Sequence, residues 1–250
     1  MIITYKEPYK LLSDKIKEIN QKCCFIGRLD PCASGISIFL TNQETKYQKK
    51  FLHLDKTYQF TLLLGLQTDT GDILGKILSY QNPSSLSLQR VFEVLQTFHN
   101  TNYFQKYQKF SSYPIKKNGI KKPLWYWAKN NRITDEEMPK HNIKIYKLDW
   151  EENIKKISVL SFVKYIEQIQ TLKGDFRCDE ILKHYHSMTN EFVFGIKCYA
   201  KVSSGTYIRQ LCLDIGEKLG FPCCAFEIER LSFHMNQDLI KELNLKIEFL

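Results

Sequence analysis

The stretch IGRLDPCASGISIFL, residues 26–40, joins a glycine-flanked loop to a strongly apolar run. The glycines permit tight backbone geometry, Pro31 fixes a turn, and the run Ile36–Leu40 is typical of a buried strand. The loop holds one carboxylate, Asp30, and no second acid, histidine or cysteine stands at catalytic spacing around it. The pattern favours chemistry that needs a single carboxylate, although aspartates often serve only to cap a turn.

Strand and helix patterns extend outward from this loop. Period-two alternation in KTYQFTLLL, residues 56–64, predicts a strand with Tyr58 and Phe60 on one face. Helical spacing predicts one helix over residues 87–98 with Ser87 as its N-cap, another over Thr206–Leu219 and a third after Ser13. Because these elements do not alternate in strict βαβ order, we expect an α+β fold with a mixed, mostly antiparallel sheet and helices on its faces. Aromatic or β-branched runs predict further strands at 36–40, 76–80, 142–150, 192–202 and 226–233.

Composition limits the class of protein. The chain of 250 residues is 43% hydrophobic, which is enough for a sizeable core, and we expect a single domain. Lys and Arg number 36 against 27 Asp and Glu, and the resulting formal charge of +9 suits a polyanionic partner. The N-terminus lacks the apolar core of a secretory signal, and no run of about 20 apolar residues follows. We therefore expect a soluble, cytoplasmic protein without a membrane partner, with an organelle left open.

The eight cysteines form no C-x-x-C pair, which favours reduced and mostly buried thiols. Cys178, His184 and His186 lack a fourth ligand at a spacing typical of zinc sites. We expect no metal.

Two segments interrupt the pattern of strands and helices. Glu151–Asn190 carries helical stretches and is interpreted as an insertion between two sheet strands. Asn100–Arg132 is basic and aromatic, which suits phosphate contacts and stacking on unpaired bases; a solvated lysine-rich loop is the alternative. The candidate RNA-contacting residues of this second segment are Lys116, Lys117, Lys121, Lys122, Trp125 and Lys129.

Five stretches, in order along the chain, resemble the TruB-type tRNA pseudouridine synthases. GRLDPCASG, residues 27–35, is similar to the catalytic-aspartate motif of that family. DKTYQFTLLLGLQTDTGDILG, residues 55–75, resembles the block that supplies an active-site tyrosine and a threonine-aspartate-threonine turn. IKKNGIKKPLWYWAKNN, residues 115–131, is similar to the RNA-gripping insertion. VSSGTYIRQLCLDIGEKLG, residues 202–220, resembles the motif that contributes an arginine, and IERL, residues 228–231, follows at the family's distance.

The resemblance implies a role for each matching side chain. Asp30 would be the catalytic carboxylate, acting at the ribose or base of a uridine while the N-glycosidic bond breaks, without cofactor or metal. Arg209 would pair with Asp30 and favour its ionised form. Tyr58 would stack on the flipped uracil and reach the carbon-five proton, and Ile228 would pack against the base. Phe25 stands where many members carry a histidine that helps to hold the T loop after base flipping. The alternative for Tyr58 and Ile228 is packing in the core, and the alternative for Arg209 is a surface position on a helix.

The resemblance also implies an organisation and a substrate. Residues 1–235 would form the pseudouridine synthase catalytic domain, with the RNA-gripping insertion at about 100–132 and a second insertion at about 151–190. The turn at residues 68–72 would stabilise the loop beneath the site. A short tail, 236–250, would leave no room for the C-terminal PUA-type RNA-binding domain of many relatives.

We therefore expect a monomer that acts alone on the T arm of tRNA, at the T-loop uridine conventionally numbered position fifty-five. Two alternatives remain. One is the same chemistry on rRNA or mRNA, and the other is a non-catalytic RNA-binding chaperone of the same fold.

Overall fold

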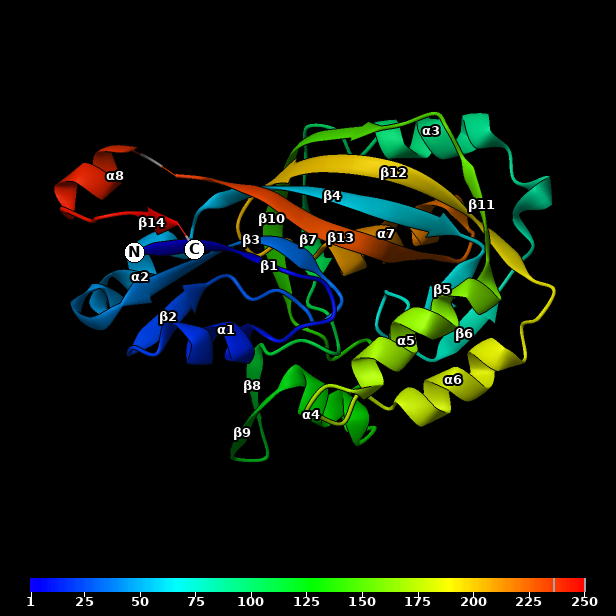
Figure 1. Ribbon diagram of the computed structural model, residues 1–250. Coiled ribbons are helices and arrows are strands. Elements are labelled where there is room, and N and C mark those ends of the chain that lie inside the picture. Colours follow the sequence, from blue (N-terminus) through cyan, green and yellow to red (C-terminus); the bar gives the residue numbers. More distant parts are fainter. Residues whose placement is uncertain (236, 250) are drawn as a thin grey trace.

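The computed structural model describes residues 1–235 and 237–249, which are built around one ten-stranded sheet (Figure 1). The strand order is β14-β1-β3-β13-β4-β12-β10-β7, with β2 added to β3 and β11 added to β12. Among the described strands, β1 with β14 and β3 with β13 pair in parallel, and the other pairs in the sheet are antiparallel. The predicted mixed, mostly antiparallel sheet is confirmed. Its strands are β1 Ile2–Lys6, β2 Cys23–Ile26, β3 Ser34–Thr41, β4 Asp55–Leu64, β7 Thr101–Lys106, β10 Lys140–Trp150, β11 Lys155–Ser158, β12 Phe192–Val202, β13 Cys223–His234 and β14 Glu248–Phe249.

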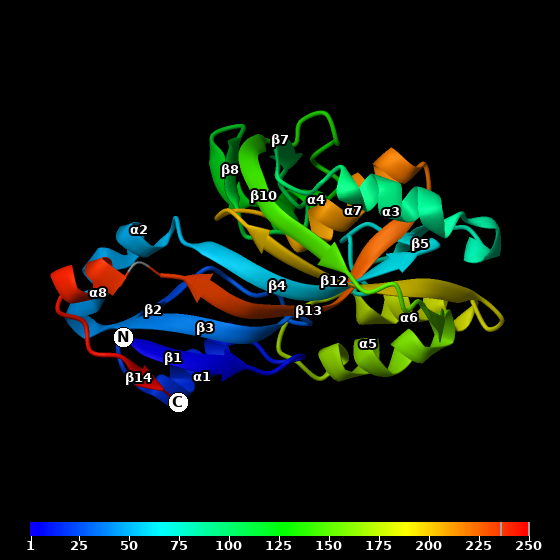
Figure 2. The same cartoon turned by 90° about the horizontal axis from the view of Figure 1, so that it is seen from above.

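Helices cover both faces of the sheet. Figure 2 shows α3 and α7 on one side of the long strands and α5 and α6 on the other. The predicted helices after Ser13, over 87–98 and over 206–219 are confirmed as α1, α3 and α7. The α-helices are α1 Leu12–Ile19, α2 Gln48–Phe51, α3 Leu88–Gln96, α4 Leu124–Lys129, α5 Val163–Gln170, α6 Cys178–His186, α7 Ile208–Leu219 and α8 Gln237–Glu242, and three 3-10 helices span Asn42–Tyr47, Pro83–Ser85 and Val159–Phe162.

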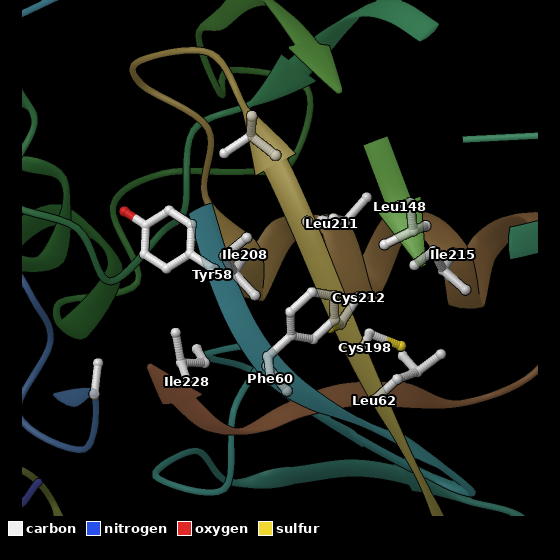
Figure 3. Close-up of a cluster of buried hydrophobic side chains, with 14 of the residues drawn as sticks. Tyr58, Phe60, Leu62, Leu148, Cys198, Ile208, Leu211, Cys212, Ile215 and Ile228 are labelled. Carbon is white, nitrogen blue, oxygen red and sulfur yellow. The ribbon is translucent and has the colours of Figure 1, made fainter. Parts of the chain in front are cut away.

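The central strand β4 shows why the sheet is buried on both faces. Tyr58, Phe60 and Leu62 share one face, as their alternation predicts, and pack with side chains of α3 and α7 in the main core (Figure 3). Leu63 points to the opposite face, where it joins a second apolar cluster with α5 and α6. A strand covered on both sides needs apolar residues on both sides, which explains the LLL ending of the motif.

The two predicted amphipathic helices next to the main core begin and pack as expected. Ser87 is the N-cap of α3, and its Oγ accepts a hydrogen bond from the backbone N–H of Arg90 at 3.4 Å. The apolar stripe of α7 is buried, with Ile208, Leu211 and Cys212 all in the main core. These packed stripes hold the start of α7 against the end of β4 that carries Tyr58 (Figure 3).

Residues 100–132 divide into two parts. Thr101–Lys106 form β7, which pairs with β10 and is an edge strand of the main sheet. The rest is a hairpin of β8, Pro114–Lys117, and β9, Ile120–Pro123, followed by α4. Trp127 is 3% exposed and lies in a small core beneath α4, so this aromatic residue packs inside the protein and is unavailable for base stacking.

Residues 151–190 contain the expected helical stretches. β11 extends the sheet beside β12, and α5 and α6 then cover its second face. Ile166 of α5 and Tyr185 of α6 are fully buried there. The segment therefore contributes to the protein core as well as to its surface.

The two ends of the described chain lie together (Figure 1). β14 pairs with β1, and the N-terminal amine of Met1 contacts Glu44 at 2.7 Å. Two residues of the predicted tail, Asn236 and Leu250, lie outside the described residues.

All eight cysteines are free, and five of them are buried, which confirms the prediction of mostly buried thiols. No described helix is long and apolar enough to cross a membrane.

Candidate active site

The Asp30 loop connects β2 to β3 and is fixed from below by a buried lysine. The ammonium group of Lys6 donates hydrogen bonds to the carbonyl oxygens of Glu7 at 3.1 Å, Pro31 at 3.0 Å and Ala33. Burial lowers the pKa of Lys6 to about 8. The backbone N–H of Ala33 also donates to the Asp30 carbonyl at 3.1 Å, which closes the turn. The loop is therefore held both by its own turn and by Lys6, which lies outside the quoted motif.

Gly35 fixes the position of the loop relative to β13. Its φ is +115°, and a Cβ added there would lie 2.3 Å from the carbonyl oxygen of Arg230 and 2.6 Å from its nitrogen. Gly35 pairs in parallel with Arg230, so the β13 backbone passes directly beside it. A side chain at Gly35 would push β3 and β13 apart and would separate the Asp30 loop from the residues of β13.

Arg209, the second residue of α7, pairs with Asp30. Its Nε lies 2.8 Å from Asp30 Oδ2, and its other nitrogens donate to the carbonyl oxygens of Thr70 at 2.9 Å and Phe110 at 3.4 Å. The Nε–H makes no hydrogen bond of good geometry to a described residue, so the contact with Asp30 is an ion pair. The predicted pairing is confirmed, and the surface-helix alternative is wrong because Arg209 is 3% exposed.

A second carboxylate, Asp72, shares the same guanidinium. Its Oδ2 lies 3.6 Å from Arg209 Nε, and its Oδ1 accepts hydrogen bonds from the Thr70 hydroxyl at 2.6 Å and the Leu74 N–H at 2.9 Å. Folding thus brings a second acid, which lies 42 residues away in the sequence, to the guanidinium that pairs with Asp30. The predicted stabilising role of residues 68–72 is confirmed by these bonds.

The two acids differ in access to solvent. The side chain of Asp72 is 5% exposed, whereas that of Asp30 is 34% exposed. Burial raises the pKa of Asp72, and the charge of Arg209 and the Thr70 hydroxyl oppose that shift. Burial also disfavours the charged Arg209, but the two carboxylates outweigh burial and raise its pKa. Asp30 is thus the acid that a ligand can reach.

A cavity of about 290 Å³ opens beside Asp30, close to the lower end of the ~300–1,000 Å³ typical of ligand pockets. Arg209, Tyr58 and Ile228 line it together with Asp30, so four of the predicted site residues come from separate elements to one place. Figure 3 shows Tyr58 and Ile228 at one edge of the apolar cluster, with the Tyr58 hydroxyl directed away from the other labelled side chains.

Three cations that sequence reasoning missed also line this cavity: Arg28 of the Asp30 loop and the buried Lys56 and Arg230. Arg230 is the β13 partner of Tyr58 and donates to the carbonyl oxygens of Ile36 at 2.8 Å and Gly27 at 3.1 Å. Burial lowers the pKa of Arg230, and the Tyr58 hydroxyl opposes the shift. Burial, with Arg230 adding to it, also lowers the pKa of Lys56 to about 8. The strands of Lys56 and Arg230 both carry other polar or charged residues as well, so the local sequence held no signal that singled out these two cations.

Phe25, Trp125 and Lys129 lie apart from this first cavity. They line a second cavity of about 590 Å³ that also touches Asp30 and Arg209. The Phe25 ring lies under the guanidinium of Arg28, whose Cζ is 5.0 Å from the ring centroid.

The remaining predicted lysines are on the β8–β9 hairpin. Lys117 contacts Glu137 at 2.6 Å and donates to the Arg132 carbonyl at 2.8 Å. Lys129, on α4, contacts Asp175. These two lysines are already paired within the chain, whereas the side chains of Lys116, Lys121 and Lys122 are exposed.

Among the described residues, no group of three or more His, Cys, Asp or Glu side chains is arranged to hold a metal ion.

Comparison with known proteins gives a family and a fold. A family model described as TruB family pseudouridylate synthase (N terminal domain) matches residues 15–169. The tRNA pseudouridine synthase B of Syntrophus aciditrophicus is 30% identical over 240 residues, which are 92% of this chain and 61% of that protein. The protein of the same name from Staphylococcus saprophyticus is 30% identical over 235 residues, 91% of this chain and 64% of that protein. The chain thus spans less than two thirds of the length of these relatives.

Among solved structures, the crystal structure of a Cbf5-Nop10-Gar1 complex contains a chain that superimposes with a TM-score of 0.53. The match covers 99% of this chain and 52% of that chain at 14% identity, and it indicates a shared fold.

Proposed function

We propose that this chain, which belongs to the TruB family of pseudouridylate synthases, isomerises uridine to pseudouridine in RNA, with the T-loop uridine of tRNA as its substrate. The observation that carries the proposal is the accessible Asp30 carboxylate, 2.8 Å from Arg209 and on the wall of the cavity that holds Tyr58. The two relatives, both named tRNA pseudouridine synthase B, support tRNA as the substrate class.

The carboxylate arrangement suits an isomerisation better than a hydrolysis. In the proposed reaction the bond from ribose C1′ to uracil N1 breaks, a bond from C1′ to C5 forms, the C5 proton leaves and N1 gains a proton. No water is consumed. Glycoside hydrolases use two working carboxylates, one of which activates water or forms a covalent intermediate. Here Asp72 is buried and its oxygens are engaged, which leaves Asp30 as the single working acid.

Each wall of the cavity has a proposed task. Asp30 acts at the ribose or base while the glycosidic bond breaks, and Arg209 holds its carboxylate in position. The Tyr58 ring stacks on the uracil, and its hydroxyl, beside the Arg230 cation, lies within reach of the C5 proton. The aliphatic side chain of Ile228 packs against the uracil base.

Binding of the RNA would rest on its folded shape and on the charge of the chain. Taking the uridine out of its stack costs a few kcal/mol, which the contacts elsewhere must offset. The exposed Lys116, Lys121 and Lys122 on the hairpin suit phosphate contacts, and Trp125, 45% exposed, suits stacking on an unpaired base. We propose that the protein acts as a monomer, without a partner chain or cofactor.

The test is pseudouridine formation in an unmodified tRNA transcript incubated with the purified protein and mapped at single-nucleotide resolution. Asp30→Asn should abolish the T-loop signal yet keep tRNA affinity within about tenfold, which is roughly 1.4 kcal/mol. Asp14→Asn is the matched control, since Asp14 lies on α1 in an exposed pair with Lys17 and should leave activity unchanged. Full activity of Asp30→Asn would remove Asp30 from the mechanism. If the wild-type protein and both variants bind tRNA tightly but form no pseudouridine, another RNA target or a non-catalytic RNA-binding role would be favoured.

A further inference from the structure

The second cavity, of about 590 Å³, is a direct neighbour of the cavity that holds Tyr58. A group bound in the second cavity would be separated from the reacting atoms only by the residues that line both cavities. Five residues line both cavities and form the shared wall: Arg28, Leu29, Asp30, Ser112 and Arg209.

The insertion at residues 151–190 supplies the outer wall of this second cavity. The loop between α5 and α6 contributes residues 174–177, and α4 lies beside that loop (Figure 1). Phe176 is half-buried, and its ring packs over Gly174, where an added Cβ would lie 2.8 Å from the ring. The proposed function so far gives this segment no task.

Ion pairs hold the 174–177 loop to the catalytic part of the protein. The Arg177 guanidinium makes two contacts with the Asp69 carboxylate, at 2.6 Å and 3.1 Å, and lies 4.1 Å from the Phe110 ring centroid. The Arg177 and Asp69 side chains are only 14% and 19% exposed, so their pairing is partly protected from solvent. Asp175 contacts Lys129 of α4. A wall held from both sides is positioned before a ligand arrives, which lowers the entropic cost of binding.

The lining of the second cavity has the chemistry of a nucleotide site. Four aromatic residues line it: Phe25 from β2, Phe110 from the loop after β7, Trp125 from α4 and Phe176 from the insertion. Such rings stack on unpaired bases with little regard to sequence. Arg28 lies over Phe25 and lines both cavities, which is where a phosphate joining two adjacent nucleotides would pass.

We propose that the second cavity binds an unpaired nucleobase directly next to the reacting uridine in the same RNA strand, with Phe176 as a stacking wall. This inference rests on the proposed function and extends it to a second nucleotide. It makes the insertion a determinant of which RNA loops the enzyme accepts.

The test pairs protein variants with altered RNAs. T-arm hairpin transcripts carry a single abasic nucleotide on the 5′ or the 3′ side of the modified uridine. Each is assayed with the wild-type protein, Phe176→Ala and Phe176→Leu for dissociation constant and single-turnover rate. Phe176→Leu keeps the apolar packing of the loop but removes the stacking ring, and Phe249→Ala is the matched control because Phe249 is 77% exposed on β14.

Loss of one base–aromatic stack should weaken binding about 5- to 150-fold. We expect that loss for both Phe176 variants on the intact RNA, and for the wild-type protein on one of the two abasic RNAs. A Phe176 variant should bind that abasic RNA little more weakly than it binds the intact RNA, because the variant already lacks the same contact. Phe249→Ala should behave as the wild-type protein on every RNA.

Equal losses from Phe176→Leu on intact and on both abasic RNAs would mean a purely structural role and would overturn the inference. Wild-type activity that is unaffected by either abasic site would also overturn it. If the wild-type protein forms no pseudouridine in intact RNA, the proposed function fails separately. The dissociation constants alone then decide whether Phe176 couples to a neighbouring base.

Discussion

Replacing Arg209 by glutamine should destabilise the protein chiefly through Asp72. The guanidinium lies between two carboxylates, 2.8 Å from Asp30 and 3.6 Å from Asp72. Asp30 is 34% exposed and can regain water when its partner is lost, whereas Asp72 is 5% exposed and cannot. Removing one partner of a buried ion pair typically costs about 3–5 kcal/mol. Because Thr70 and Leu74 still donate to Asp72, we expect a loss near 3 kcal/mol.

The pH dependence of this loss follows from the same carboxyl. Burial already raises the pKa of Asp72, and Arg209 opposes the shift, so removing Arg209 should raise the pKa of Asp72 further. Between the unfolded pKa of about 3.9 and the raised folded value, the folded state then binds a proton that the unfolded state does not. Stability therefore falls as pH rises through that window. The deficit of Arg209→Gln should be largest near pH 7 and smaller near pH 4.

Urea denaturation of four proteins measures both effects: the wild-type protein, Arg209→Gln, Asp72→Asn and the double variant. The double variant should recover about 2 kcal/mol relative to Arg209→Gln, because an amide is much less costly to bury than an unpaired charge. The proposed isomerase activity should be absent from both Arg209→Gln and the double variant, since Asp30 lacks its partner in each. A deficit below about 1 kcal/mol in Arg209→Gln, or one that Asp72→Asn leaves unchanged, would refute the reasoning.

Two further predictions concern the frame of the site. Gly35→Ala should destabilise by about 3 kcal/mol or more, since its Cβ would lie 2.3 Å from the Arg230 carbonyl oxygen, while Gly119→Ala, with no described atom within 4 Å, should cost only about 1–2 kcal/mol in chemical denaturation. Lys56 has a pKa lowered by burial to about 8, so above that pH the unfolded state binds the extra proton and stability should rise with pH. From pH 7.5 to 9.5 the wild-type protein should gain about 2 kcal/mol relative to Lys56→Met, and an unchanged difference would mean that Lys56 is hydrated in the folded protein.

The site shows which residues could be predicted from local sequence. Asp30, Tyr58, Arg209 and Ile228 stand in stretches whose pattern or resemblance singles them out, and the structure brings all four to one cavity. Asp72 was identified as a stabilising residue of its turn, but its contact with Arg209 depends on two segments that meet only in the folded chain.

The amino-acid sequence by itself determined the main elements of the fold, because strand alternation and helical stripes are local periodicities. The alternation in β4, the Ser87 cap of α3 and the buried stripe of α7 could each be inferred from neighbouring residues. Strands as short as β1 and β7, with five and six residues, gave no comparable pattern.

Only the tertiary structure decided how the site is supported. Lys6 supports the Asp30 loop, and Arg230 lies beside Tyr58. Each contacts residues that are at least 25 positions away in the sequence. The placement of the 174–177 loop against Asp69 and Lys129 likewise follows from packing of α5 and α6 on the sheet. Charge pairing and close backbone approach depend on distances in space, and local sequence patterns do not contain those distances.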